Sequence, residues 1–278
     1  MPDKRYSTLR KQLDDGVATV TFDNPPLNLV TPEVIGELTL LLEELRTDDR
    51  VRTIVFDSAD PDFFIGHADL NLFLGPRDRV PPKGNTLNPL QTLLETLRTL
   101  PKATIAMLDG RAVGIGPEFL TSCDMAFASD RSVLMQFEVA MGVLPGATGS
   151  QRLPRLLGRM RALEVILGCD EIAADVAERY GFINRAMPVA ELKPFVKRLA
   201  HRIATFPAQA IALTKVAVDA ADHLPIHLGL LEESHTLNQT LVSGEAQRRM
   251  KSFLAMGAQT VEFEKNDFAS SLDKLQSS

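Results

Sequence analysis

Residues 103–150 read ATIAMLDGRAVGIGPEFLTSCDMAFASDRSVLMQFEVAMGVLPGATGS, and this stretch decides the fold. The apolar run 103–108 is typical of a buried strand, and it leads through glycines into a helical pattern that begins near residue 115. Two further segments, 123–128 and 133–136, are strand-like. Alternation of strands and helices predicts an α/β protein, and the clustered glycines predict places where backbone segments approach closely.

The N-terminal side of this stretch continues the same alternation. Period-two patterning over residues 6–23 predicts two strands joined by a hairpin turn at 14–16. Thr31 is typical of a helix N-cap, and apolar residues at helical spacing predict a helix from there to Leu45. The proline-rich stretch 75–89 predicts a mobile loop.

The C-terminal side has a different character. Fourteen of the 17 glycines lie before residue 182, whereas residues 188–261 show almost continuous amphipathic helical spacing. We therefore expect an α/β core over residues 1–195 and a helical region over residues 196–263. The Ser- and charge-rich residues 264–278 predict a flexible tail.

Composition excludes several classes of protein. The 278 residues are 45% hydrophobic and 24% charged, as in an ordinary globular protein and unlike collagen or a disordered chain. A net charge of -6 argues against a nucleic-acid partner. Cys123 and Cys169 lack CxxC spacing, and no apolar run suits a targeting segment or a membrane span, so we expect a cytoplasmic protein that makes no membrane contact.

Two glutamates are the candidates for chemistry. Glu118 lies about one turn into the helix that begins near Gly114, where it could simply complement the helix dipole or could handle a proton beside backbone donors. Glu138 lies between Phe137 and Val139, an apolar setting in which a carboxylate needs a partner or a role. The spacing of the glycines before Phe119 does not complete a dinucleotide-binding fingerprint.

Five segments in register resemble the enoyl-CoA hydratase/isomerase (crotonase) family. They are FFIGHADL at 63–70, GIGPE at 114–118, CD at 123–124, EVAMGVLPG at 138–146 and GSQRL at 149–153. The likeness extends from Asn24 to Phe253. It implies a crotonase-like spiral of β-β-α units, followed by a helical C-terminal region used for trimerisation.

The resemblance also implies roles for particular residues. The backbone N–H groups of Ala68 and Ile115 match the oxyanion hole that holds the thioester carbonyl. Glu118 and Glu138 match the paired catalytic glutamates. Two carboxylates suit hydration, and we assign Glu118 chiefly to activating water and Glu138 chiefly to protonating C2.

Substrate contacts are implied for four residues of the first segment, Gly66, His67, Asp69 and Leu70, and for Gly114 in the second. His67 stands where the family often has a small residue, so it could line the pocket or could be a hydrogen-bonded structural histidine. The pair His223 and His227 is interrupted by Pro225, so no metal site is expected.

The expected activity is that of a hydro-lyase, an enoyl-CoA hydratase that adds water reversibly across the C2=C3 bond of a 2-enoyl-CoA. The CoA thioester is the substrate, and no cofactor is expected. Two alternatives stay open: an isomerase or another reaction of the superfamily on acyl-CoA, and a non-catalytic acyl-CoA-binding or scaffold protein. The resemblance further implies a homotrimer or homohexamer.

Overall fold

The computed structural model describes residues 6–76, 78–80 and 82–276, and its larger sheet has six strands in the order β1-β2-β3-β5-β7-β10. β1 runs antiparallel to β2, and every other neighbouring pair is parallel. The strands are β1 (Leu9–Asp14), β2 (Val17–Phe22), β3 (Thr53–Ser58), β5 (Ala103–Leu108), β7 (Met125–Ser129) and β10 (Arg185–Met187).

A second sheet of four short strands has the order β4-β6-β8-β9. They are β4 (Phe63–Ile65), β6 (Arg111–Val113), β8 (Val133–Met135) and β9 (Ile172–Ala173). Along the chain β3, β5 and β7 of the larger sheet are each followed by a strand of the smaller one and then by a helix. This repeated β-β-α turn is the spiral that the sequence resemblance implied, and the α/β class is confirmed.

Helices cover the two sheets. They are α1 (Pro32–Thr47), α2 (Pro89–Arg98), α3 (Ile115–Leu120), α4 (Gly149–Leu157), α5 (Arg159–Gly168) and α6 (Ala174–Tyr180), with short 3₁₀ turns η1 (Leu70–Leu72) and η2 (Glu138–Met141). Phe119 fixes α3 between the sheets. Its ring centroid lies 5.0 Å from that of Phe56 in the larger sheet and 6.2 Å from that of Phe64 in the smaller one.

Local sequence signals account for the first elements. Asp15 and Gly16 have φ values of 45° and 80°, as a two-residue hairpin turn between β1 and β2 requires. The Thr31 side chain accepts a hydrogen bond from the N–H of Val34, which caps α1 as expected. The predicted hairpin and capped helix are both present.

Helix α7 (Val189–Ala204) spans the expected boundary near residue 195. Its buried Leu192, Val196 and Ala200 pack in a second apolar cluster with strand residues such as Ile105 of β5. α7 is therefore part of the α/β body, and the change of character falls after Ala204, ahead of Pro207.

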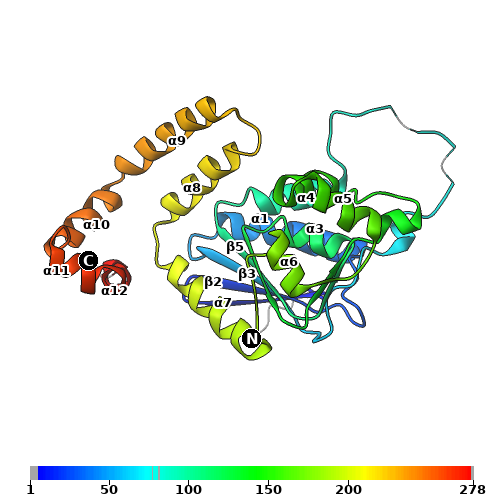
Figure 1. Ribbon diagram of the computed structural model, residues 1–278, viewed down its shortest axis with the longest axis horizontal. Helices are drawn as coiled ribbons and strands as arrows, with labels where there is room; N and C mark the ends of the chain where they lie inside the picture. Colours follow the sequence, from blue (N-terminus) through cyan, green and yellow to red (C-terminus); the bar gives the residue numbers. More distant parts are fainter. Residues whose placement is uncertain (1–5, 77, 81, 277–278) are drawn as a thin grey trace.

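Beyond α7 the chain forms a C-terminal arm, residues 208–276, that extends away from the sheets (Figure 1). Two ion pairs join its first helix to the body: Lys215 to Asp124 at 2.8 Å and Asp219 to Arg98 at 2.7 Å. The arm consists of α8 (Ala208–Ala220), α9 (Ile226–Leu241), α10 (Gly244–Ala255), α11 (Val261–Asn266), α12 (Phe268–Leu272) and η3 (Asp273–Gln276). None of the helices that the structure describes is long and apolar enough to cross a membrane.

The end of the arm differs from the flexible tail expected over residues 264–278. α11, α12 and η3 continue the helical structure to Gln276, and residues 277–278 lie outside the described range. The reason is aromatic packing, since Phe253 lies 5.2 Å from Phe263 and 5.1 Å from Phe268 in edge-to-face contacts. The polar composition of this stretch gave no indication of the aromatic cluster.

The stretch 75–89 departs from the body as a long excursion before α2 (Figure 1). Its described residues before Pro89 form no helix or strand, and residues 77 and 81 lie outside the description. The mobility of this segment stays a prediction.

Replacing Phe263 should loosen the end of the arm. Phe263 is 5% exposed and contacts both other rings, so Phe263→Ala removes the centre of that core and should cost about 3 kcal/mol of local stability. Hydrogen–deuterium exchange over residues 257–276 should accelerate. Val261→Ala, on the same helix but 73% exposed, serves as the control and should leave exchange unchanged. Equal exchange in both variants would contradict the packing explanation.

Candidate active site

Glu118 is a buried carboxylate held by backbone amides. It lies in α3 with 2% of its surface exposed, and its Oε1 accepts hydrogen bonds from the N–H groups of Ala147, Thr148 and Gly149 at 3.1, 2.8 and 2.6 Å. Burial raises the pKa of Glu118, and the three amide hydrogen bonds act in the opposite direction. The three hydrogen bonds fix the carboxylate in one orientation and stabilise its ionised form.

The turn that supplies these amides is itself held by α2. The carbonyl of Gly146 accepts hydrogen bonds from Nδ2 of Asn88 at 3.2 Å and from Nε2 of Gln91 at 3.1 Å. Asn88 and Gln91 also form the capping box that starts α2. Because the Gly146 carbonyl and the Ala147 N–H belong to one planar peptide, the first turn of α2 orients a donor to Glu118.

Glu138 has a contrasting environment. It is the first residue of η2, and its Oε2 is buried without a hydrogen-bond partner. Burial, with a smaller contribution from the charge of Glu118, raises the pKa of Glu138 to about 7. A carboxyl group whose pKa lies near neutrality can both give and accept a proton at neutral pH.

Two backbone amides face the same region. Ile115 is the first residue of α3, so its N–H has no acceptor within the helix. Ala68 forms an isolated parallel bridge with Val30, in which Val30 bonds to the carbonyl of His67 and to the N–H of Asp69. The N–H of Ala68 itself therefore points away from Val30.

One cavity of about 510 Å³ joins these groups. The four residues expected to carry the chemistry, namely Ala68, Ile115, Glu118 and Glu138, all line it. The rest of the wall is mainly apolar: Ile35, Leu70, Leu72, Phe73, Leu90, Phe137, Met141, Val143 and Leu144 contribute to it. Such a wall suits an acyl chain beside a few polar groups.

Of the five residues expected to contact substrate, two line the cavity and three do not. Gly114 and Leu70 line the cavity. Gly66, His67 and Asp69 do not belong to its lining, and each has a local structural contact. A Cβ on Gly66 would lie 2.6 Å from the carbonyl oxygen of Leu27, so this glycine permits two backbones to cross.

Local hydrogen bonds account for the other two. Nδ1 of His67 lies 2.8 Å from the carbonyl oxygen of Ala68, which favours the structural alternative for this histidine. Oδ1 of Asp69 accepts the N–H of Asn71 at 2.9 Å and caps η1. Direct roles of Gly66, His67 and Asp69 in binding substrate stay predictions.

Sequence reasoning missed the groups that hold Glu118. The donors at 147–149 are backbone amides, which carry no side-chain signature, although the glycines at 146 and 149 indicated a close approach. Asn88 and Gln91 could have been found as a capping-box pattern before the helix at residue 89.

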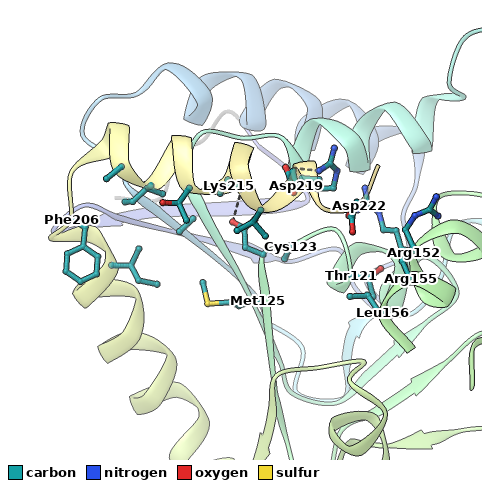
Figure 2. Close-up of a pocket in the computed structure, with 18 of the residues that line it drawn as sticks. Thr121, Cys123, Met125, Arg152, Arg155, Leu156, Phe206, Lys215, Asp219 and Asp222 are labelled. Atoms are coloured by element: carbon teal, nitrogen blue, oxygen red, sulfur yellow. Dashed lines mark ion pairs between the residues drawn. The ribbon is translucent and has the colours of Figure 1, made fainter. Parts of the chain in front are cut away.

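A larger cavity, of about 710 Å³, lies between α8 and the body and has a different character (Figure 2). Of its three acidic groups, Asp124 pairs with Lys215 and Asp219 pairs with Arg98, and Asp222 also lines the cavity. Cys123 lines it, and burial raises the pKa of that thiol well above its usual value. Two of its acids are paired and its thiol is protonated, so the smaller cavity, with Glu118 and Glu138, is the better candidate for acid–base chemistry.

Within residues 6–76, 78–80 and 82–276, no three His, Cys, Asp or Glu side chains gather closely enough to hold a metal ion.

The spiral of β-β-α turns, with two carboxylates and two unpaired backbone N–H groups at one cavity, is typical of a crotonase-type α/β protein. The family model for enoyl-CoA hydratase/isomerase matches residues 12–266. The chain belongs to the enoyl-CoA hydratase/isomerase family, and this makes it an enzyme of the crotonase superfamily. The resemblance seen in the sequence is thereby confirmed.

Individual relatives agree with that assignment. A short-chain-enoyl-CoA hydratase of Clostridium acetobutylicum is 29% identical over 86% of this chain and 91% of its own. A candidate enoyl-CoA hydratase from Streptomyces avermitilis, of known crystal structure, is 39% identical, with a TM-score of 0.71 and 96% of each chain covered. An enoyl-CoA hydratase of Bacillus anthracis is 25% identical, with a TM-score of 0.83 over 90% of this chain and 97% of that one.

Adding a methyl group at residue 66 should destabilise the protein. In Gly66→Ala the new Cβ meets backbone at 2.6 Å, so the free energy of unfolding should fall by about 2 kcal/mol or more. Gly36→Ala is the matched control, because nothing lies within 4 Å of its Cβ, and it should gain about 0.5–1 kcal/mol of stability within α1. Urea unfolding of both variants measures the difference, and similar midpoints would contradict the close approach.

Removing the titration of Glu138 should change stability only at higher pH. Its folded pKa of about 7 exceeds the ordinary value of 4.5, so the stability contributed by the bound proton is complete below pH 4.5 and is lost as pH rises through 7. Glu138→Gln stays neutral throughout, so its melting temperature should exceed that of wild type by a few degrees at pH 8 and match it near pH 4.5. The exposed Glu33→Gln is the control, and an offset independent of pH in Glu138→Gln would refute the assignment.

Proposed function

We propose that the protein is an enoyl-CoA hydratase, a hydro-lyase that adds water reversibly across the C2=C3 bond of a 2-enoyl-CoA thioester. The observation that carries this proposal is the presence of two carboxylates, the buried Glu118 and the half-buried Glu138, in one mainly apolar cavity beside the amides of Ala68 and Ile115. Water addition needs a base for the water and an acid for the adjacent carbon, and the two glutamates can fill those roles.

In the proposed mechanism Glu118 activates the water. Its Oε1 is occupied by three amides, so Oε2 is the oxygen that takes the proton as the water oxygen bonds to C3. Glu138 gives its proton to C2, for which a pKa of about 7 suits it. Proton exchange from Glu118 to Glu138 then restores the starting state, and one molecule of water has been added.

Charge develops on the thioester oxygen while C3 is attacked. The N–H groups of Ala68 and Ile115 are proposed to hold that oxygen, since both residues line the cavity and neither N–H is used by the bridge or helix around it. Fixed donors in a site shielded from water stabilise an enolate-like oxygen without reorganising during the reaction.

Isomerisation of a 3-enoyl-CoA is the second candidate. It needs a single carboxylate that moves a proton between C2 and C4, and Glu138 with its raised pKa would suffice. The amide contact that orients Glu118 favours hydration, because an isomerase would have no use for a second fixed base. A protein that only binds acyl-CoA would need neither carboxylate.

The acyl-CoA is proposed as substrate, with no cofactor. A homotrimer or homohexamer is proposed on the strength of apolar side chains that the C-terminal arm exposes, including Val218, Ile226, Leu231 and Val242. Surfaces of this kind are typically covered by a partner subunit. The cytoplasmic location stays a prediction.

Loss of conjugated thioester absorbance on crotonyl-CoA tests the hydratase proposal. Wild type should turn over, and Glu118→Gln and Glu138→Gln should each lower kcat by about 10²–10⁴, because each variant keeps the shape of the side chain and removes a proton carrier. Glu33→Gln, an exposed change in α1, should keep wild-type kcat.

Other outcomes distinguish the alternatives. Full activity in both active-site variants would overturn the assigned roles. Activity of Glu118→Gln on a 3-enoyl-CoA, with Glu138→Gln inactive, would indicate an isomerase. Binding of acyl-CoA by wild type without turnover on short, medium or aromatic enoyl-CoAs would indicate a binding protein.

A further inference from the structure

Gln136 is a buried amide that the proposed mechanism does not use. It follows β8, its side chain is 0% exposed, and its Nε2 donates a hydrogen bond of 3.0 Å to the carbonyl oxygen of Gly114. Its Oε1 is buried and has no hydrogen-bond partner. A buried carboxamide with an unsatisfied oxygen is less stable than an apolar side chain of the same size, so packing alone does not account for Gln136.

The bond to Gly114 acts on one particular peptide. The carbonyl of Gly114 and the N–H of Ile115 belong to the same planar unit, so fixing the direction of the carbonyl fixes the opposite direction of the N–H. A donor on the carbonyl also polarises the peptide and strengthens its N–H as a donor. Gln136 therefore contributes a side-chain donor to both the aim and the strength of the amide proposed to hold the thioester oxygen.

The same peptide is also held by the helix, because Gly114 is the N-cap of α3 and its carbonyl accepts the first intrahelical hydrogen bond. Gly114 has a φ of 56°, a region that glycine adopts freely, so its own conformational preference does not hold the plane. On its N-terminal side the N–H of Gly114 bonds to the carbonyl of Met135 at 2.8 Å, in line with the pairing of β6 and β8. On the C-terminal side Gln136 adds a side-chain donor to the carbonyl that also caps α3, so residues 135 and 136 contact both polar groups of Gly114.

We propose that Gln136 is a positioning residue of the oxyanion hole, whose carboxamide orients and polarises the 114–115 peptide so that the Ile115 N–H binds the thioester oxygen as it gains charge. This inference rests on the proposed function. Gln136 does not line the cavity, so it acts through the 114–115 peptide. Its effect should fall mainly on kcat, because the oxygen is more negative in the transition state than in the bound substrate.

The test compares wild type with Gln136→Met, which keeps the length of the side chain and removes the N–H donor. The probe is 4-aminocinnamoyl-CoA, whose absorption moves to longer wavelength when its thioester carbonyl is polarised. We expect wild type to shift the bound probe, and Gln136→Met to lose at least half of that shift. On crotonyl-CoA the variant should lose about tenfold or more in kcat, with KM changed less than threefold.

Gln136→Glu gives a reading that a purely structural role would not produce. A neutral carboxylic acid can donate to the Gly114 carbonyl, whereas a carboxylate cannot. Burial raises the pKa of a carboxyl at this position, so the probe shift, taken relative to wild type at the same pH, should be retained while the new carboxyl is protonated and should fall at the higher pH where it ionises. Gln136→Met should show no such dependence on pH. If Gln136→Met does not fold, the Gln136→Glu variant still tests whether a donor to the Gly114 carbonyl polarises the probe.

A stability control separates packing from positioning. Val20→Ala creates a cavity in the core at β2, so it should lower the melting temperature while leaving the probe shift and kcat unchanged. A full probe shift and wild-type kcat in folded Gln136→Met, or a probe shift in Gln136→Glu that stays at the level of Gln136→Met from pH 5.5 upward, would overturn the inference. If wild type itself neither turns over enoyl-CoAs nor shifts the probe, the proposed function is what fails.

Discussion

Three backbone N–H groups directed at one oxygen of Glu118 are the contact on which the site depends. A buried carboxylate without such donors would take up a proton or be excluded from the interior. The amides make burial tolerable, and they join the start of α4 to α3 in the process. Burial raises the pKa of Glu138 to about 7, and one of its carboxylate oxygens has no hydrogen-bond partner. One cavity thus contains two carboxyl groups that burial shifts toward the protonated form and that differ in their hydrogen bonding.

Much of the architecture follows from local patterns in the chain. The turn at Asp15 and Gly16 and the cap at Thr31 depend on neighbours only a few residues away, and both were predictable. The spiral and the positions of Glu118 and Glu138 came from resemblance to a family, because the return of distant strands to a common sheet is a long-range property. The structure brings both glutamates to the same cavity, as that resemblance implied.

Features that depend on backbone groups or on distant partners were not predictable. The donors to Glu118 are amides, whose identity no residue type reveals. Asp69 and His67 lie in a family motif, yet local hydrogen bonds occupy both side chains, so a motif position did not specify a contact with the cavity. The polar composition after Glu264 suggested disorder because that stretch contains a single phenylalanine, Phe268, whose aromatic partners lie before it in the chain.

The shared carbonyl of Gly146 also bears on how this fold can diversify. The irregular segment before α2 ends at Asn88, and Asn88 and Gln91 reach the donor to Glu118 through a single peptide. Sequence change earlier in the segment can reshape the approach to the cavity without disturbing that peptide, whereas change at Asn88 or Gln91 reaches the carboxylate directly. Two amide side chains therefore separate the irregular segment from the peptide that holds Glu118, so the two can change independently.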